Sequence, residues 1–227
     1  MLTSEKPLSS IFWFWIPVIA MTIQAILEVT VSKEILSGLH SENGPHELLE
    51  FFILVGGLIV CLKYFLTSEY KSRLMNFWFG LAFICCFYVA GEEISWGQHV
   101  WDWATPDYWN GVNDQGETNL HNTSSWFDQK PRLILLLGIT VGTLILPHLY
   151  ERGKLPLPCS LGILLPSKKL TVIALLVVIP QLIEKLFEAF NVSIFVRFSE
   201  VQELYMFYFV FLYLILLQIE LRKQKNT

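Results

Sequence analysis

The sequence predicts an all-α polytopic membrane protein: a six-helix transmembrane bundle with both termini in the cytoplasm. Of the 227 residues, 53% are hydrophobic and only 16% are charged, whereas soluble domains contain about 25% charged residues. Six apolar stretches also reach the roughly 20 residues that a helix needs to cross the hydrocarbon core. The expected spans are about 11–31, 47–66, 75–98, 131–150, 169–191 and 201–221. Because little of the chain lies outside them, residues 1–227 are expected to form one membrane domain.

The first apolar stretch is interpreted as a retained membrane helix and not as a cleaved signal peptide. Lys6 before it is balanced by Glu5, and no small-residue cleavage site follows it. A signal peptide would have a basic start, a shorter apolar region and such a site. The number of expected spans is therefore even.

The basic residues of the loops predict the orientation. The loop after the second span carries Lys71 and Arg73, and the loop after the fourth carries Arg152 and Lys154. Short cytoplasmic loops are enriched in Lys and Arg, so these loops and both termini are placed in the cytoplasm. The expected location is the cytoplasmic (inner) membrane of a bacterium. The chain shows no basic stripe, finger motif or RNA-binding motif, so no nucleic-acid partner is expected.

A set of nine carboxylates in or beside the spans falls in their outer halves under this topology: Glu28, Glu47, Glu50, Glu92, Glu93, Glu184, Glu188, Glu200 and Glu203. Their convergence predicts one outward-facing polar cavity, since ionisable groups are costly in a bilayer unless paired, hydrated or metal-bound. Two alternative interpretations remain. Acids that begin a helix interact favourably with its dipole without any cavity, and the deeper acids could form ion pairs with Lys33 or Lys185. The supporting residues expected around this cavity are Glu28, Glu47, Glu50, Gln98, Asn119, Glu184, Glu188, Glu200 and Glu203.

Glu92 and Glu93 are the candidate catalytic residues. They stand in the run GEEISWGQH at the outer end of the third span, where the helix dipole disfavours negative charge. A helix-end explanation is therefore weakest for this pair. We expect one of them to act as a general base and the other to bind a metal.

The outer loop of residues 100–130 contains a second polar group. Glu117 and His121 are four residues apart, so they would share one face of a helix. Imidazole and carboxylate groups are common ligands for zinc and other first-row metals. The predicted metal ligands are His121, Glu117, His99 and Glu93, with a divalent cation such as Zn²⁺ as the cofactor. His40, His46 and His148 are interpreted as bystanders.

Two runs in the middle third of the chain carry a family resemblance. The run GEEISWGQ from Gly91 to Gln98 and the run QGETNLHN from Gln115 to Asn122 resemble a group of uncharacterised multi-pass bacterial membrane proteins. A looser similarity is to the CAAX-protease-like glutamate intramembrane proteases, whose first motif is EExxxR. Glu92 and Glu93 match its two acids, and Gly97 stands in place of the arginine. This similarity implies an activating glutamate on a membrane helix.

Three functions are compatible with these features. The first is a metal-dependent hydrolase that acts on a lipid, a lipid-linked molecule or a peptide at the outer face. The second is a cation or proton transporter or channel, although the apolar inner halves of the spans offer it no polar path. The third is a non-catalytic assembly or sensor subunit whose acidic pocket binds a partner. Membrane lipids are expected neighbours in each case, and a homo-oligomer is compatible with all three.

Overall fold

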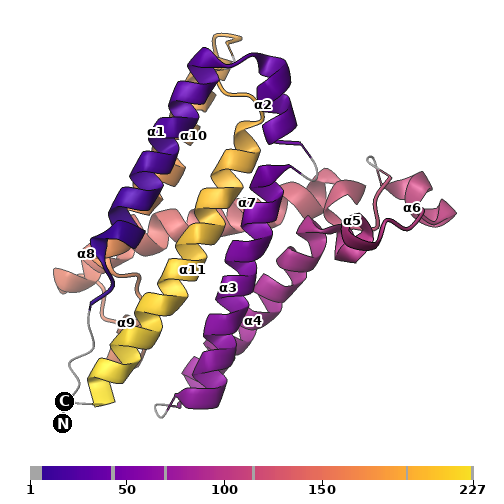
Figure 1. The fold of residues 1–227 in the computed structure, drawn as a ribbon. Helices are drawn as coiled ribbons and strands as arrows, with labels where there is room; N and C mark the ends of the chain where they lie inside the picture. Colours follow the sequence, from indigo (N-terminus) through magenta and orange to yellow (C-terminus); the bar gives the residue numbers. More distant parts are fainter. Residues whose placement is uncertain (1–6, 42–43, 69–70, 114–115, 193, 226–227) are drawn as a thin grey trace.

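The bundle consists of helices, and among the described residues no strand occurs. The computed structural model describes residues 7–41, 44–68, 71–113, 116–192 and 194–225. Six helical segments are long and apolar enough to cross a membrane, which confirms the all-α, six-span prediction. Pro7 and Lys225 lie at one end of the bundle (Figure 1). We call the opposite end the distal end.

The six spans are formed by long helices, several of them extended by short π- or 3₁₀-helical turns. Their bounds are η1 Ile11–Trp15 with α1 Ile16–Thr30, α3 Pro45–Thr67, α4 Arg73–Glu93, α7 Ser125–Ile139 with η4 Thr140–Ile145 and α8 Leu146–Glu151, η5 Lys168–Leu170 with α10 Thr171–Glu188, and α11 Phe198–Lys225. Short helices lie in the connections: α2 Lys33–Leu39, η2 Ser95–Gly97, α5 Gln98–Trp101, α6 Asp107–Val112, η3 His121–Thr123 and α9 Cys159–Gly162.

Two helix boundaries differ from the expected ones. Helix α4 ends at Glu93 and not at residue 98, because Ser95 and Trp96 adopt positive φ angles of 47° and 56°. Such left-handed conformations are incompatible with a continued right-handed helix. Helix α7 begins at Ser125, earlier than the apolar stretch that predicted it. The first difference lengthens the connection between the third and fourth spans at its start, and the second shortens it at its end.

The half of the bundle away from the distal end has an apolar core between α3, α4 and α11. Cys61 and Tyr64 of α3 pack there with Met75 and Phe79 of α4 and with Leu221 of α11. The rings of Tyr64 and Phe79 are stacked, with centroids 4.0 Å apart. A second core joins α10 to α11 and α7. These contacts fix α11 at the centre of the bundle, between α3 and α10 (Figure 1).

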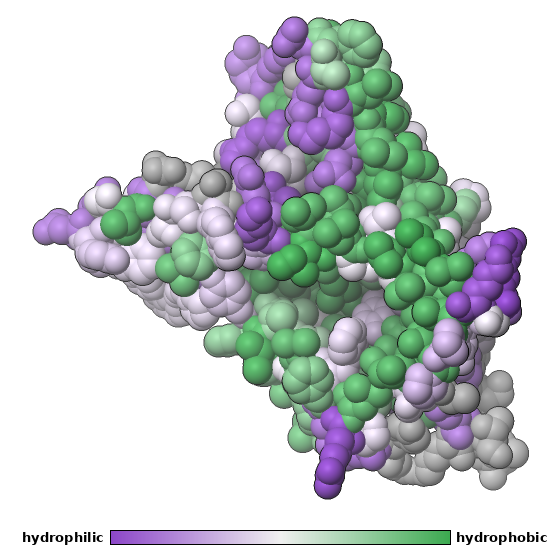
Figure 2. All heavy atoms as spheres, turned by 180° about the vertical axis from the view of Figure 1, so that it is seen from behind, coloured by the Kyte–Doolittle hydropathy of each residue, from purple (hydrophilic) through white to green (hydrophobic). Residues whose placement is uncertain are grey.

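The outer surface of the spans is largely hydrophobic, as the back face in Figure 2 shows. Ile84 of α4 is 65% exposed and Leu182 of α10 is 64% exposed, an unfavourable arrangement in water but the expected one in lipid. The continuous segment from α7 to α8 is steeply inclined behind α11 (Figure 1). The start of α7 packs against η3, which directly precedes it in the chain.

Candidate functional site

Three carboxylates from three helices meet near the distal end. Glu50 of α3, Glu93 of α4 and Glu203 of α11 each place a carboxylate oxygen within 4.8 Å of the other two. Glu50 has no exposed surface, and its carboxylate oxygens meet no N–H or hydroxyl donor among the described residues. The Glu93 carboxyl group is close enough to share a proton with it. Glu203 forms an ion pair with Arg132 of α7. We call Glu50, Glu93 and Glu203 the carboxylate cluster.

The cluster has the donor set of a site for a hard divalent cation. Three carboxylates so close together cannot all remain ionised without compensation by a cation or by protons. Arg132 supplies one positive charge, but its ion pair is with Glu203. Mg²⁺, Mn²⁺ and Ca²⁺ prefer carboxylate oxygens, whereas zinc sites more often include imidazole or thiolate. The residues therefore fit a hard cation better than Zn²⁺.

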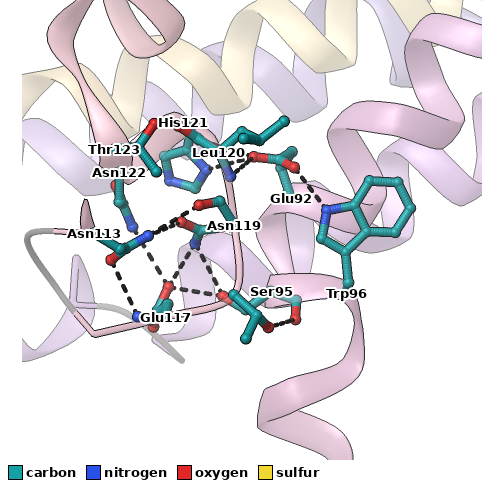
Figure 3. A network of polar contacts seen from close by, with 11 residues as sticks. Glu92, Ser95, Trp96, Asn113, Glu117, Asn119, Leu120, His121, Asn122 and Thr123 are labelled. Carbon is teal, nitrogen blue, oxygen red and sulfur yellow. Dashed lines mark hydrogen bonds and ion pairs between the residues drawn. The ribbon is translucent and has the colours of Figure 1, made fainter. Parts of the chain in front are cut away.

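Glu92 belongs to a different set of contacts from its neighbour Glu93. Its side chain accepts hydrogen bonds from the backbone N–H groups of Leu120 (2.6 Å) and His121 (2.9 Å). The indole N–H of Trp96 donates to its other oxygen at 2.7 Å. Figure 3 shows these donors converging on the carboxylate. Glu92 therefore holds the outer loop against the end of α4, and both of its oxygens are engaged.

Glu117 is the centre of a second buried network in the same loop (Figure 3). Its Oε2 accepts hydrogen bonds from Ser95 Oγ at 2.7 Å and from Asn119 Nδ2 at 2.6 Å, with Asn122 Nδ2 at 3.4 Å. Its backbone N–H donates to Asn113 Oδ1 at 3.1 Å. The structure thus brings Glu117 together with amides and a hydroxyl, and the described contacts do not join it to Glu93.

The two runs that carry the family resemblance bind to each other. Besides the contacts of Glu92 and Glu117, Gln98 Oε1 accepts hydrogen bonds from the backbone N–H and the hydroxyl of Thr118 at 2.8 and 3.0 Å. Gly91 makes room for the arrangement, because a Cβ there would lie 2.8 Å from the ring of Trp96. We call the contacts between residues 91–98 and 117–121 the loop latch.

His121 belongs to the loop latch and is also close enough to the carboxylate cluster to interact with the charges of Glu93 and Glu203. Its Nδ1 is 3.6 Å from Glu92 Oε2, and its side chain is 34% exposed. Burial alone would lower the pKa of His121, but the hydrogen bond with Glu92 and the charge of Glu93 outweigh it and raise the pKa. His121 can therefore hold a proton near the cluster. His99, also a predicted ligand, has its side chain outside the described part of the structure.

The other acids of the expected cavity are distributed over the distal end. Glu28 and Glu184 each accept a hydrogen bond from the connection before α11, from Val196 N–H at 3.1 Å and Phe195 N–H at 3.4 Å respectively. Glu188 pairs with Lys185, and Glu200 with Arg197. Glu47 interacts electrostatically with Glu93. The structure thus brings only part of the predicted set together.

A buried histidine pair links α2 to the start of α3. His40 is 1% exposed, and its Nδ1 lies 3.0 Å from His46 Nδ1. Its Nε2 lies 3.1 Å from Gln24 Nε2, which can only donate. Nε2 of His40 must therefore accept, so its proton is on Nδ1 and is donated to His46. Sequence analysis treated both histidines as bystanders. The one available signal was that His46 stands four residues before Glu50.

This tautomer predicts a loss of stability in acid. Burial and the positive charge of Arg197 lower the pKa of His40 below 6.5, despite Glu28 at 3.8 Å. The folded state then binds fewer protons than the unfolded state, so the free energy of unfolding decreases as the pH falls below 6.5. Thermal unfolding of wild-type protein should show a larger drop in Tm between pH 7 and pH 5 than that of His40→Gln. Parallel pH profiles for the two proteins would contradict this assignment.

Comparisons with known proteins do not assign the chain to a family. A scan against protein-family models and searches of curated proteins and of solved structures found no match. The resemblance carried by residues 91–98 and 115–122 therefore stays a prediction. The site must be interpreted from its own chemistry.

Proposed function

We propose that the chain is an integral membrane hydrolase that uses a divalent cation held by the carboxylate cluster. The observation that carries the proposal is Glu50, a fully buried carboxyl group within 4.8 Å of the carboxylates of Glu93 and Glu203, with no hydrogen-bonding neighbour among the described residues other than the acidic Glu93. An uncompensated buried charge of this kind is costly. A cation bound by all three carboxylates removes that cost.

The bound cation would supply a nucleophile, because a divalent metal lowers the pKa of its water and polarises the bond under attack. Glu93 is less buried than Glu50 and lies at the end of α4, so it is the better placed of the two to take the proton of that water. His121 holds a proton on the loop side and can give it to the leaving group. In the net reaction, the hydroxyl group of water is added to the acyl or phosphoryl group, and its proton is transferred to the alcohol that leaves.

The distribution of polar groups favours chemistry at one face over transport. The core of Cys61, Tyr64, Met75 and Phe79, in the half away from the distal end, is apolar. A cation or proton path would need polar groups in that half. We further propose, from the basic loops, that the distal end faces outward from a bacterial inner membrane. A sensor or assembly subunit would keep its function when the carboxylates of the cluster are replaced by neutral residues, whereas the proposed enzyme would lose it.

The test is incorporation of oxygen from isotopically labelled water. Purified protein is placed in vesicles of phosphatidylethanolamine, phosphatidylglycerol and phosphatidic acid in H₂¹⁸O, with Mg²⁺ or Mn²⁺, and the products are analysed by mass spectrometry. The proposal expects ¹⁸O in a released phosphate or carboxylate. The label should depend on the cation, decrease at least about tenfold in Glu93→Gln through loss of the metal site and base, and persist in the exposed control Glu151→Gln, which lies outside both proposed sites. Absence of label in wild-type protein, or equal labelling in Glu93→Gln, would contradict the proposed hydrolysis.

A further inference from the structure

A cavity of about 570 Å³ opens between α7, α10 and the start of α11. Its volume lies within the range of about 300–1,000 Å³ that is usual for small-molecule sites. One wall comes from residues 129–136 of α7, one from residues 181–188 of α10, and the third from residues 195–202. We call it the α7–α10 cavity.

Positive charge predominates in the lining of this cavity. Four cationic and two anionic side chains line it: Lys130, Arg132, Lys185, Arg197, Glu184 and Glu188. Glu184 is turned inward, 6% exposed, and accepts a hydrogen bond from the Phe195 N–H. Glu188 is paired with Lys185. The net charge of these six residues is +2. Arg132 and Arg197 also form ion pairs with Glu203 and Glu200 outside the lining, so an anionic ligand would share these two cations with the acids.

Neutral donors complete the lining. Gln202 is 6% exposed, and its Nε2 has no hydrogen-bond partner among the described residues. A buried amide N–H without an acceptor costs free energy that a ligand oxygen would recover. Ser199 and Gln181 add a hydroxyl and a second amide to the same walls. Several donors around a cationic site suit the oxygens of a phosphate group.

The surroundings of the cavity are apolar on the membrane side. Leu133, Leu136, Phe195 and Phe198 also line it, and Leu133 is 46% exposed. On the back face in Figure 2, a hydrophilic area at the distal end borders a broad hydrophobic surface. A ligand with a charged head and hydrocarbon chains matches both surfaces at once.

We propose that the α7–α10 cavity binds the phosphate headgroup of an anionic phospholipid, with its acyl chains along the apolar surface of α7 and α10. Arg132 lines the cavity and also pairs with Glu203 of the carboxylate cluster, so it would hold the phosphate beside the proposed cation. The placement next to the cation rests on the proposed function. Lipid binding itself does not.

Binding is measured by native mass spectrometry in detergent with EDTA, on wild-type protein and on Glu50→Gln, so that neither a cation nor turnover contributes. The lipids are phosphatidic acid, phosphatidylglycerol and phosphatidylcholine, with glycerol 3-phosphate as a soluble competitor. The test variant is Lys130→Gln with Arg197→Gln. Its matched control is Lys154→Gln with Lys168→Gln, which removes two basic residues outside this cavity.

Phosphatidic acid and phosphatidylglycerol should bind more tightly than phosphatidylcholine to wild type and to Glu50→Gln. Loss of two cations should weaken their binding by roughly tenfold, and the control pair should not. Equal binding of phosphatidylcholine, or equal effects of the two double variants, would overturn the proposal. Full displacement by glycerol 3-phosphate would assign the cavity to a soluble phosphate and overturn the lipid assignment. If lipid binds as expected but wild type shows no cation-dependent labelling, the proposed hydrolysis fails alone.

Discussion

Glu50→Gln is expected to abolish binding of the divalent cation while leaving the bundle folded. The substitution removes one of three ligands and the only one that is fully buried. It also removes the charge that most needs compensation, so the remaining Glu93 and Glu203 face Arg132 with less mutual repulsion. Metal content, measured by elemental analysis of purified protein, should fall from about one equivalent in wild type to background.

Thermal unfolding with and without chelator provides the second measurement. At a cation concentration about 100 times the Kd, binding stabilises the folded state by about 2.7 kcal/mol. For a chain of this size that corresponds to roughly 5–10 °C in Tm. Chelator should lower the Tm of wild type by this amount and leave that of Glu50→Gln unchanged.

Glu117→Gln distinguishes a metal site in the carboxylate cluster from the metal site that the sequence predicted in the outer loop. Glu117 and His121 were predicted ligands, but the Glu117 carboxylate is bound by Ser95 and Asn119. We therefore expect Glu117→Gln to retain its metal. If it loses metal and Glu50→Gln does not, the site lies in the loop and the carboxylate cluster is only structural. No stoichiometric metal in wild-type protein would remove the metal site altogether.

The spans could be predicted from sequence because length and apolar composition alone decide whether a helix can cross a bilayer. The end of α4 could not, because Gly91 to Gln98 contains no proline that would end a helix before residue 98. Only the backbone shows the positive φ angles at Ser95 and Trp96. Ser95 is held in place by partners more than twenty positions later, Glu117 and Thr118, whereas Trp96 is held by its hydrogen bond to Glu92.

The position of the acids at one end of the bundle could also be predicted from the sequence. Which of them contact each other could not. Depth follows from position along a span, so Glu50, Glu93 and Glu203 were all expected at the same end. Which of them meet depends on how each helix is rotated and inclined. Arg132 is an example of a contact that could not be predicted. It pairs with Glu203 because α7 is inclined toward α11, and nothing in its local sequence indicates this partner.

Glu92 and Glu93 illustrate the same limit within two consecutive residues. Successive side chains on a helix point about 100° apart. Glu93 consequently faces Glu50 and Glu203, whereas Glu92 faces the outer loop. The sequence-based hypothesis assigned one chemistry to the pair. The structure supports separate roles, a ligand for Glu93 and an anchor for Glu92.

Glu92→Gln is accordingly expected to release the outer loop without removing the metal ligands. The carboxylate accepts three hydrogen bonds in a site where it is 3% exposed. An amide replaces one of the two acceptor oxygens by an NH₂ group, so either the indole N–H or the two backbone N–H groups lose their acceptor. Loss of one partner in a buried charged network costs about 3–5 kcal/mol. The loop latch should therefore open well before the bundle unfolds.

Limited proteolysis in detergent measures this opening. Cleavage within the connection between α5 and α7 should become much faster in Glu92→Gln than in wild type, while Glu93→Gln, the adjacent control of identical chemistry, should be cleaved at the wild-type rate. Metal content should show the opposite pattern, being retained in Glu92→Gln and lost in Glu93→Gln. Two variants with the same phenotype in both measurements would mean that latch and cluster act as one unit. The assignment of an anchor and a ligand to neighbouring glutamates would then be wrong.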